Sequence, residues 1–271
     1  MVQERRGRYE RRDRVGQAVG GNAVSQRATT DGALLGGRVA YRQYRDFYRS
    51  GLEPVLLAAA VPAVAGERVL EAGCGAGAGL ACLGVRIPGL SGTGIEQDPE
   101  MAALARYNLA ANRLDWPVLA LPVAALRDAA ALDGTGFDHA FANPPWHRAD
   151  GSRSPDPRRD LARRAPAGML NDWAGSLATC LRPHGTLTLA LPASLHAQGC
   201  AALLEHGFGG IRLMPFWPKP GRAARIILLR GTRGGLGDSV VLPGLTLHEE
   251  GGGFTEEAEA ILRGAAPLPL G

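Results

Sequence analysis

Residues 67–79, with the sequence ERVLEAGCGAGAG, join an apolar stretch to a turn in which every second residue is glycine. The apolar stretch is typical of a buried strand, and glycines let the backbone that follows turn sharply and approach a ligand closely. Glu96 ends the next apolar stretch, 21 residues after Gly75, where a carboxylate can accept both hydroxyls of a ribose. The segment therefore predicts a strand, a ligand-binding turn and a helix, with an adenosine-containing cofactor as the ligand.

The same turn fits two kinds of cofactor. Gly73, Gly75 and Ala78 satisfy the looser form of the dinucleotide fingerprint, which indicates a nicotinamide cofactor. Glu71, two residues before the first glycine, favours a cofactor with a positive amino-acid ammonium. Its carboxylate would repel a pyrophosphate that docks on the helix N-terminus.

Strands and helices alternate along the rest of the chain, which predicts a doubly wound parallel sheet with helices on both faces. The last two strands are separated only by residues 218–221, Pro-Lys-Pro-Gly, so they must form an antiparallel hairpin. A mostly parallel, seven-stranded sheet closed by such a hairpin is typical of the Rossmann-like class I methyltransferase fold, whereas a dehydrogenase would continue with another parallel unit. The expected strands are 67–73, 92–97, 118–121, 137–143, 186–192, 210–217 and 224–230, and the expected helices include 53–60, 77–85, 99–112, 168–182 and 194–206.

The tetrapeptide Asn143-Pro144-Pro145-Trp146 follows the fourth expected strand, at the sheet edge where open α/β proteins bind ligands. The two prolines stiffen the backbone and aim the Asn143 side chain and the Pro144 carbonyl, both of which are hydrogen-bond acceptors. Two acceptors that hold the N–H bonds of an exocyclic amine favour a pyramidal nitrogen whose lone pair points at a methyl group. Trp146 can stack on a planar base. Together with the acidic glycine-rich turn, the tetrapeptide predicts methyl transfer from S-adenosylmethionine to such a nitrogen.

On these motifs the chain resembles the Asn-Pro-Pro-aromatic branch of the S-adenosylmethionine methyltransferases, and more closely the tRNA1(Val) adenine-37-N6 methyltransferase family, over residues 31–262. The pre-motif helix of that family is matched by residues 51–57, with Glu53 where the family usually has Asp. The chain also departs from the pattern because no Asp closes the third strand, where an acid that contacts adenine is common; Asp128 is the nearest. The resemblance implies a cofactor site that comprises Glu71, Gly73, Cys74, Gly75, Glu96, Gln97 and Asn143, and a catalytic set that comprises Asn143, Pro144, Pro145 and Trp146.

Basic residues flank the expected catalytic edge. The loop 152–164 carries five arginines, and residues 207–237 carry six basic residues and no acid. Such residues can bind phosphates beside unpaired bases. The expected substrate-binding residues are Trp146, His147, Arg158, Arg159, Lys219 and Arg222, with RNA, and tRNA in particular, as the partner.

Composition and charge support one compact domain with a tail. The 271 residues carry a net charge of +4, and residues 1–30 hold seven arginines against three acids, which accounts for all of it. We expect 1–30 to be a disordered tail, 31–66 a cap, 67–231 the catalytic core and 232–271 a C-terminal appendage. Four cysteines without a CxxC pair predict free thiols and no metal site, and the lack of a long apolar run predicts a cytoplasmic protein without a membrane partner.

The sequence thus predicts an N-methyltransferase that acts on an exocyclic amine, with adenine N6 in tRNA as the first choice. Ribosomal-RNA guanine N2 and a protein glutamine N5 amide are alternatives, since the same acceptors could hold either. Trp146-His147 also matches the aromatic-His pair of the guanine-N2 enzymes. A nicotinamide-dependent oxidoreductase and a non-catalytic nucleotide-binding module are alternatives of a different class, and neither needs the tetrapeptide.

Overall fold

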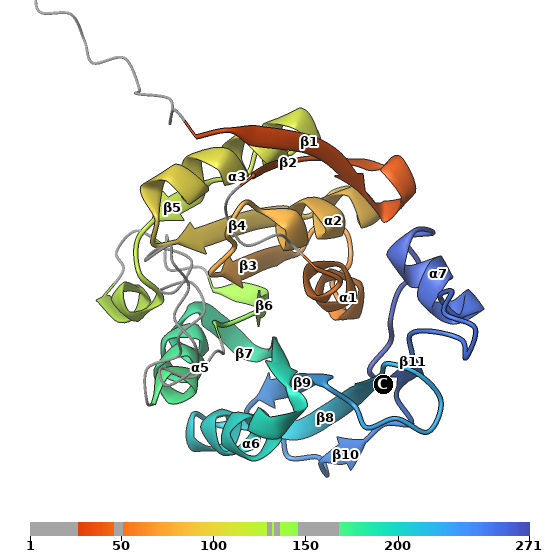
Figure 1. Ribbon diagram of the computed structural model, residues 1–271. Coiled ribbons are helices and arrows are strands. Elements are labelled where there is room, and N and C mark those ends of the chain that lie inside the picture. Colours follow the sequence, from red (N-terminus) through yellow and green to blue (C-terminus); the bar gives the residue numbers. More distant parts are fainter. Residues whose placement is uncertain (1–26, 46–50, 129–131, 133–135, 146–167) are drawn as a thin grey trace, which may run out of the picture.

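The computed structural model describes residues 27–45, 51–128, 132, 136–145 and 168–271. Within them, the main sheet has nine strands in the order β10-β8-β9-β7-β6-β3-β4-β5, with β11 also paired to β8 (Figure 1). The bounds are β3 (Arg68–Ala72), β4 (Ser91–Glu96), β5 (Val118–Ala120), β6 (Phe137–Ala142), β7 (Leu181–Pro192), β8 (Phe208–Trp217), β9 (Ile226–Arg233), β10 (Val240–Val241) and β11 (Leu245–Thr246).

The seven longer strands reproduce the expected mostly parallel sheet. Strands β3 to β7 are parallel to their neighbours, and β9 lies antiparallel between β7 and β8, which confirms the closing hairpin. Besides these seven, the short strands expected from the sequence near 239–248 are present as β10 and β11, which add two residues each at the outer edge of β8. The chain builds outward from β3 to β5 and then returns to β6 on the other side of β3, so a crevice opens where β3 and β6 end.

Helices cover both faces of the sheet (Figure 1). One buried apolar cluster lies under α1 (Glu53–Ala60), α2 (Ala78–Arg86), α3 (Pro99–Ala111) and α7 (Glu256–Leu262). The other lies under α5 (Met169–Cys180) and α6 (His196–Glu205). The remaining helical segments are the short turns η1 (Leu35–Gly37), η2 (Val123–Asp128) and η3 (Ala193–Leu195).

A hairpin that the sequence did not predict precedes the core. Strands β1 (Thr29–Leu34) and β2 (Val39–Tyr44) pair antiparallel and lie across α3 (Figure 1). Tyr41 and Tyr44 are buried against Ala76 and Met101, so the hairpin covers the glycine-rich turn as well as the helix. The expected boundary of the tail at residue 30 is therefore wrong, since β1 includes Thr29 and Thr30.

Two asparagines of α3 hold this hairpin in place. The Asn108 side chain is buried; its Oδ1 accepts from the Arg42 N–H, and its Nδ2 donates to the carbonyls of Arg42 and Ala76, each at 2.8 Å. Asn112 repeats the pattern one turn later on the two backbone groups of Ala40. Asn108 thus joins the hairpin, α3 and the glycine-rich turn in one buried network.

We expect Asn108→Ala to lower the free energy of unfolding by on the order of 3 kcal/mol, because it leaves buried backbone groups unpaired. Asn112→Ala is the matched control: the bonds between Asn112 and Ala40 are exposed, so water replaces them and the loss is smaller. Denaturant unfolding measures both. Equal losses in the two variants would show that burial of the Asn108 network is not what stabilises the hairpin.

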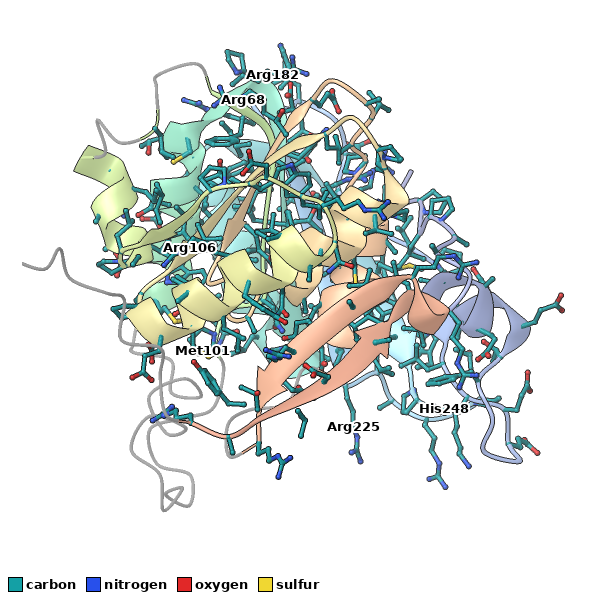
Figure 2. The ribbon with its side chains drawn as sticks, turned by 90° about the horizontal axis from the view of Figure 1, so that it is seen from above. Arg68, Met101, Arg106, Arg182, Arg225 and His248 are labelled. Carbon is teal, nitrogen blue, oxygen red and sulfur yellow. The ribbon has the colours of Figure 1, made fainter. Side chains whose placement is uncertain are left out.

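A polar cluster marks the opposite, amino end of the parallel strands. The His139 ring contacts the Glu67 carboxylate at 3.0 Å and the Thr186 hydroxyl at 2.8 Å, and Arg182 pairs with Asp138 at 2.7 Å. Burial lowers the pKa of His139. Figure 2 shows Arg182 beside Arg68 at this end, and Met101 and Arg225 toward the other.

Candidate active site

The glycine-rich turn begins where β3 ends and leads into α2. Gly73 has a φ of 64° and lies against the ring of Trp173, since a Cβ on it would be 2.7 Å from the Trp173 Cη2. Both features exclude a larger residue at position 73. The Cys74 N–H donates to the Ile95 carbonyl at 2.9 Å, which fixes the turn to the end of β4.

Glu71 lies beneath the turn rather than in solvent. Its side chain is buried, with 4% exposure, and its Oε2 accepts from the Leu80 N–H in the first turn of α2 at 2.9 Å. A Cβ on Gly79 would overlap the Glu71 carboxylate, so glycine there lets the helix approach the acid. Burial, with a smaller contribution from the Glu96 charge, raises the pKa of Glu71 to about 8. The buried Cys74 thiol has its pKa raised for the same reasons.

Glu96 supports the turn from β4. Its Oε2 accepts from the Gly75 N–H and its Oε1 from the Asp98 N–H, each at 2.9 Å, and burial raises its pKa. Each carboxylate oxygen keeps a second lone pair, which leaves Glu96 able to accept the hydroxyls of a ribose. Gln97 is exposed at the same strand end.

Asn143 follows β6, the neighbour of β3. Its Oδ1 is buried, and among the described residues it has no hydrogen-bond partner. A buried acceptor without a donor destabilises the fold by about 1–3 kcal/mol. The unpartnered Asn143 Oδ1 therefore indicates a hydrogen-bond donor that comes from a bound molecule.

Three other buried side-chain oxygens share this property within the described part of the chain: Oε2 of Glu53, Oε1 of Gln43 and Oγ1 of Thr188. Glu53 is the first residue of α1, which packs on β6 and β7. The C-terminal carbonyls of α1 accept from Arg86, at the end of α2, so both helices start at the carboxyl edge of the sheet. The sequence marked Glu53 by its place in the pre-motif helix, but nothing in the pattern around Gln43 singled it out.

The structure therefore brings most of the expected cofactor and catalytic residues to one edge. Nine of them lie at or just past the ends of three adjacent strands, β4, β3 and β6. They are Glu71, Gly73, Cys74, Gly75, Glu96, Gln97, Asn143, Pro144 and Pro145. Lys219 and Arg222 lie apart from them, exposed on the turn between β8 and β9. Trp146, His147, Arg158 and Arg159 lie outside the described residues.

The acceptors at this edge fit S-adenosylmethionine. Glu71 and Glu96 carry carboxyl groups, and the unpartnered oxygens of Glu53 and Asn143 are acceptors, whereas the amino-acid end of this cofactor carries an ammonium donor and a sulfonium charge. Within the described residues no group of His, Cys, Asp and Glu could hold a metal ion, and no helix could cross a membrane.

Comparison with known proteins agrees with this geometry. Residues 54–214 match the family described as "Methyltransferase small domain". A curated relative from Shewanella amazonensis, the tRNA1(Val) (adenine(37)-N6)-methyltransferase, is 30% identical over 78% of this chain and 88% of its own length. The enzyme of the same name from Aeromonas hydrophila is 27% identical over 68% of this chain and 76% of its own.

Solved structures show the same fold. A predicted O-methyltransferase from Agrobacterium tumefaciens superposes with a TM-score of 0.67 and 26% identity, covering 80% of this chain and 98% of its own. The T. thermophilus 16S rRNA N2 G1207 methyltransferase, solved with AdoMet and guanosine, superposes with a TM-score of 0.53 and 21% identity, covering 77% of this chain and 51% of its own. The chain belongs to the methyltransferase small domain family and is an S-adenosylmethionine-dependent methyltransferase.

Proposed function

We propose that the chain methylates an exocyclic amine of a nucleobase, and specifically adenine N6 in tRNA. The observation that carries the proposal is the buried, unpartnered Oδ1 of Asn143 at the end of β6. It is an acceptor, so it suits an amine N–H and does not suit a hydroxylate or thiolate substrate. The names of the Shewanella and Aeromonas relatives support adenine in tRNA as the target.

The side chains at this edge would act by position rather than by proton abstraction. Asn143 Oδ1 and the Pro144 carbonyl would accept the two N–H bonds of the amine, which aims its lone pair at the methyl group. Bound S-adenosylmethionine supplies that methyl group as an electrophile. The amine nitrogen forms the new bond to the methyl carbon as the carbon–sulfur bond breaks, and the nitrogen then loses its extra proton to solvent.

We expect Glu96→Ala to weaken S-adenosylmethionine binding at least tenfold, about 1.4 kcal/mol. The variant would lose the ribose contact and also the brace on the Gly75 N–H. Isothermal calorimetry measures the affinity, and Glu257→Ala, an exposed carboxylate on α7, is the control. An unchanged affinity in Glu96→Ala would remove Glu96 from the cofactor site.

The substrate is tested by mass spectrometry of nucleosides from tRNA treated with the purified enzyme. We expect N6-methyladenosine, with activity that falls steeply as salt rises, because phosphate contacts depend on salt. Charge reversal of Arg158 and Arg159 should raise KM for tRNA and leave cofactor binding unchanged.

Guanine N2 in ribosomal RNA is the second candidate, because the T. thermophilus neighbour is named as an enzyme of that type. If the enzyme methylated guanine in rRNA fragments and left tRNA unmodified, guanine N2 would replace adenine N6 as the target. Methylation of a protein amide alone would overturn both nucleic-acid substrates and leave the methyltransferase assignment standing.

A further inference from the structure

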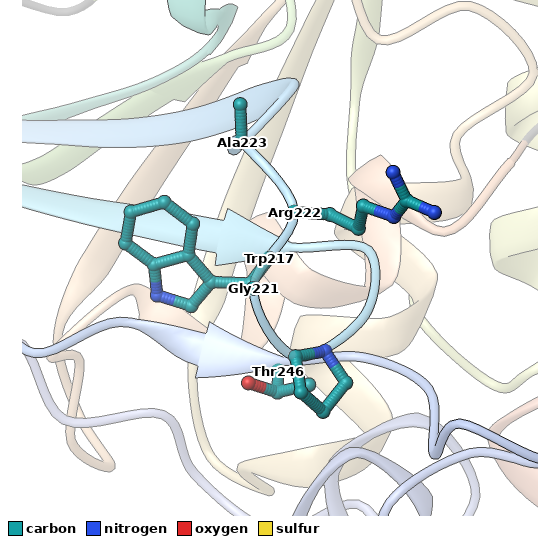
Figure 3. A pocket seen from close by; sticks show the side chains of 6 residues that line it. Trp217, Gly221, Arg222, Ala223 and Thr246 are labelled. Atoms are coloured by element: carbon teal, nitrogen blue, oxygen red, sulfur yellow. The ribbon is translucent and has the colours of Figure 1, made fainter.

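A shallow depression of about 430 Å³ lies at the turn between β8 and β9, away from the cofactor turn. It is lined by Trp217, Pro220, Gly221, Arg222, Ala223 and Thr246 (Figure 3). Trp217 is the last residue of β8, and Thr246 is its register partner in β11. A Cβ on Gly221 would meet nothing within 4 Å, which shows that the depression is open to solvent there.

The indole of Trp217 is held in one orientation. Its Nε1 donates to the Pro243 carbonyl at 3.2 Å, and Gly244 packs so closely that a Cβ on it would overlap the same nitrogen. Trp217 keeps part of its surface exposed. A ring that is fixed at its edge and open beside a hollow is a stacking platform with little conformational freedom left to lose.

Positive charge adjoins the platform. Lys219, Arg222 and Arg225 are exposed on this turn. The Lys219 ammonium already donates to the Glu250 carbonyl at 3.0 Å. Within the described part of the chain, neither the Arg222 nor the Arg225 guanidinium has an ion-pair partner, so these two are left to meet a phosphate.

The depression lies at the same edge of the sheet as Asn143, the carboxyl edge. Strand β8 runs parallel to β7 and β6, so Trp217 ends β8 at the carboxyl edge. Ala142 of β6 is in register with Leu189, and β7 continues beyond it to Pro192, which pairs with Ile226 at the start of β9. In Figure 2, Arg225 lies toward the end of the molecule opposite to Arg68 and Arg182.

The separation suits a short single-stranded segment. Between β6 and β8 lie three strand spacings, which amount to about 14 Å across the sheet. The turn thus stands beside the place that the target base would occupy, at a distance that nucleotides adjoining the target can bridge.

We propose that this depression, the Trp217 subsite, holds an unpaired base that neighbours the target base in the RNA, stacked on the indole, with Arg222 and Arg225 on the flanking phosphates. The proposal rests on the proposed RNA substrate and adds a recognition site to it. An aromatic face with two free guanidinium groups suits a base and its phosphates, and it is sequence-tolerant because every base has a π-face.

A double-mutant cycle between protein and RNA tests the subsite. The RNA is a tRNA stem-loop that the wild-type enzyme methylates, and in separate versions each nucleotide within three positions of the target is made abasic. Kinetics with wild type, Trp217→Ala and Trp217→Phe give kcat/KM for every pair. We expect Trp217→Ala to reduce kcat/KM about tenfold to a hundredfold, and Trp217→Phe to restore most of it.

The decisive result is the energetic coupling between an abasic position in the RNA and the substitution Trp217→Ala. One abasic position should impair the wild type as strongly as Trp217→Ala does, and it should have no further effect in Trp217→Ala. Arg222→Ala and Arg225→Ala should raise KM and lower the salt dependence, whereas the control Arg113→Ala, an exposed arginine just past α3, should change neither. Melting temperature and cofactor affinity confirm that each variant is folded.

Two failures can be told apart. If the wild-type enzyme methylates RNA but every abasic effect adds independently to Trp217→Ala, the Trp217 subsite is wrong and the proposed function stands. If the wild-type enzyme methylates no RNA and Trp217→Ala lowers activity on a protein amide, both the subsite and the proposed substrate are overturned.

Discussion

Asn143→Ala should lower kcat by about a hundredfold to a thousandfold while the affinity for S-adenosylmethionine stays within about twofold. The hydrogen bond from the amine to Asn143 Oδ1 strengthens as the nitrogen becomes pyramidal, so it stabilises the transition state more than the bound substrate. Single-turnover methylation of tRNA gives the rate of the chemical step, and calorimetry gives the cofactor affinity.

The stability of this variant separates a functional from a structural role. The Asn143 Oδ1 has no hydrogen-bond partner among the described residues, so its removal takes no hydrogen bond from the fold. We therefore expect little loss of melting temperature. Asn171→Ala is the control for an asparagine with a structural role, since its side chain forms hydrogen bonds with Glu205 and His206 on the surface of α5 and α6. A variant that retained near-normal turnover would show that the Asn-Pro-Pro segment only shapes the backbone.

The elements that repeat a strong pattern could be read from the sequence. Apolar strands that alternate with helices predicted a mostly parallel sheet, and the Pro-Lys-Pro-Gly turn predicted the antiparallel β8–β9 pair. The β1–β2 hairpin could not be found in this way. Its strands expose charged residues to solvent, and Asn108 and Asn112, about seventy residues away, hold it through contacts that no local pattern encodes.

The candidate site, too, could be predicted from the sequence only in part. The positions of Glu71, Glu96 and Asn143 follow from motif spacing, because each residue lies at or next to the end of a parallel strand. Their surroundings do not follow from it. The sequence predicted Glu71 beside the ammonium of the cofactor, but burial under Gly79 and the bond from Leu80 depend on how α2 packs on β3. Trp173 reaches this edge only through tertiary packing against Gly73, and no neighbour in sequence marks it.

The burial of Glu71 has a consequence for stability that depends on pH. In the unfolded chain its carboxyl group ionises near its ordinary pKa of 4.5, whereas in the folded protein burial raises the pKa to about 8. Between these values the folded state holds a proton that the unfolded state has released. The contribution of Glu71 to the free energy of unfolding should therefore fall by about 1.4 kcal/mol for each pH unit from 4.5 to 8, and be constant above that.

Glu71→Gln isolates this effect because the amide stays neutral and can still accept from the Leu80 N–H. We expect the variant and the wild type to have similar stability at pH 4.5, and the variant to become the more stable by several kcal/mol at pH 8. Denaturant unfolding across this range measures the difference. Glu257→Gln, at an exposed carboxylate, should leave the pH profile unchanged.

Cofactor binding should change the protonation of the Glu71 carboxyl group. A carboxylate near a bound ammonium is stabilised in its charged form, so S-adenosylmethionine should lower the pKa of Glu71 and release a proton at pH 7. The measured enthalpy would then depend on the ionisation enthalpy of the buffer for the wild type but not for Glu71→Gln. If both proteins bound the cofactor with the same buffer-independent enthalpy, while Glu71→Gln still changed the pH profile of unfolding, Glu71 would be a buried acid beneath the turn with no electrostatic contact to the cofactor.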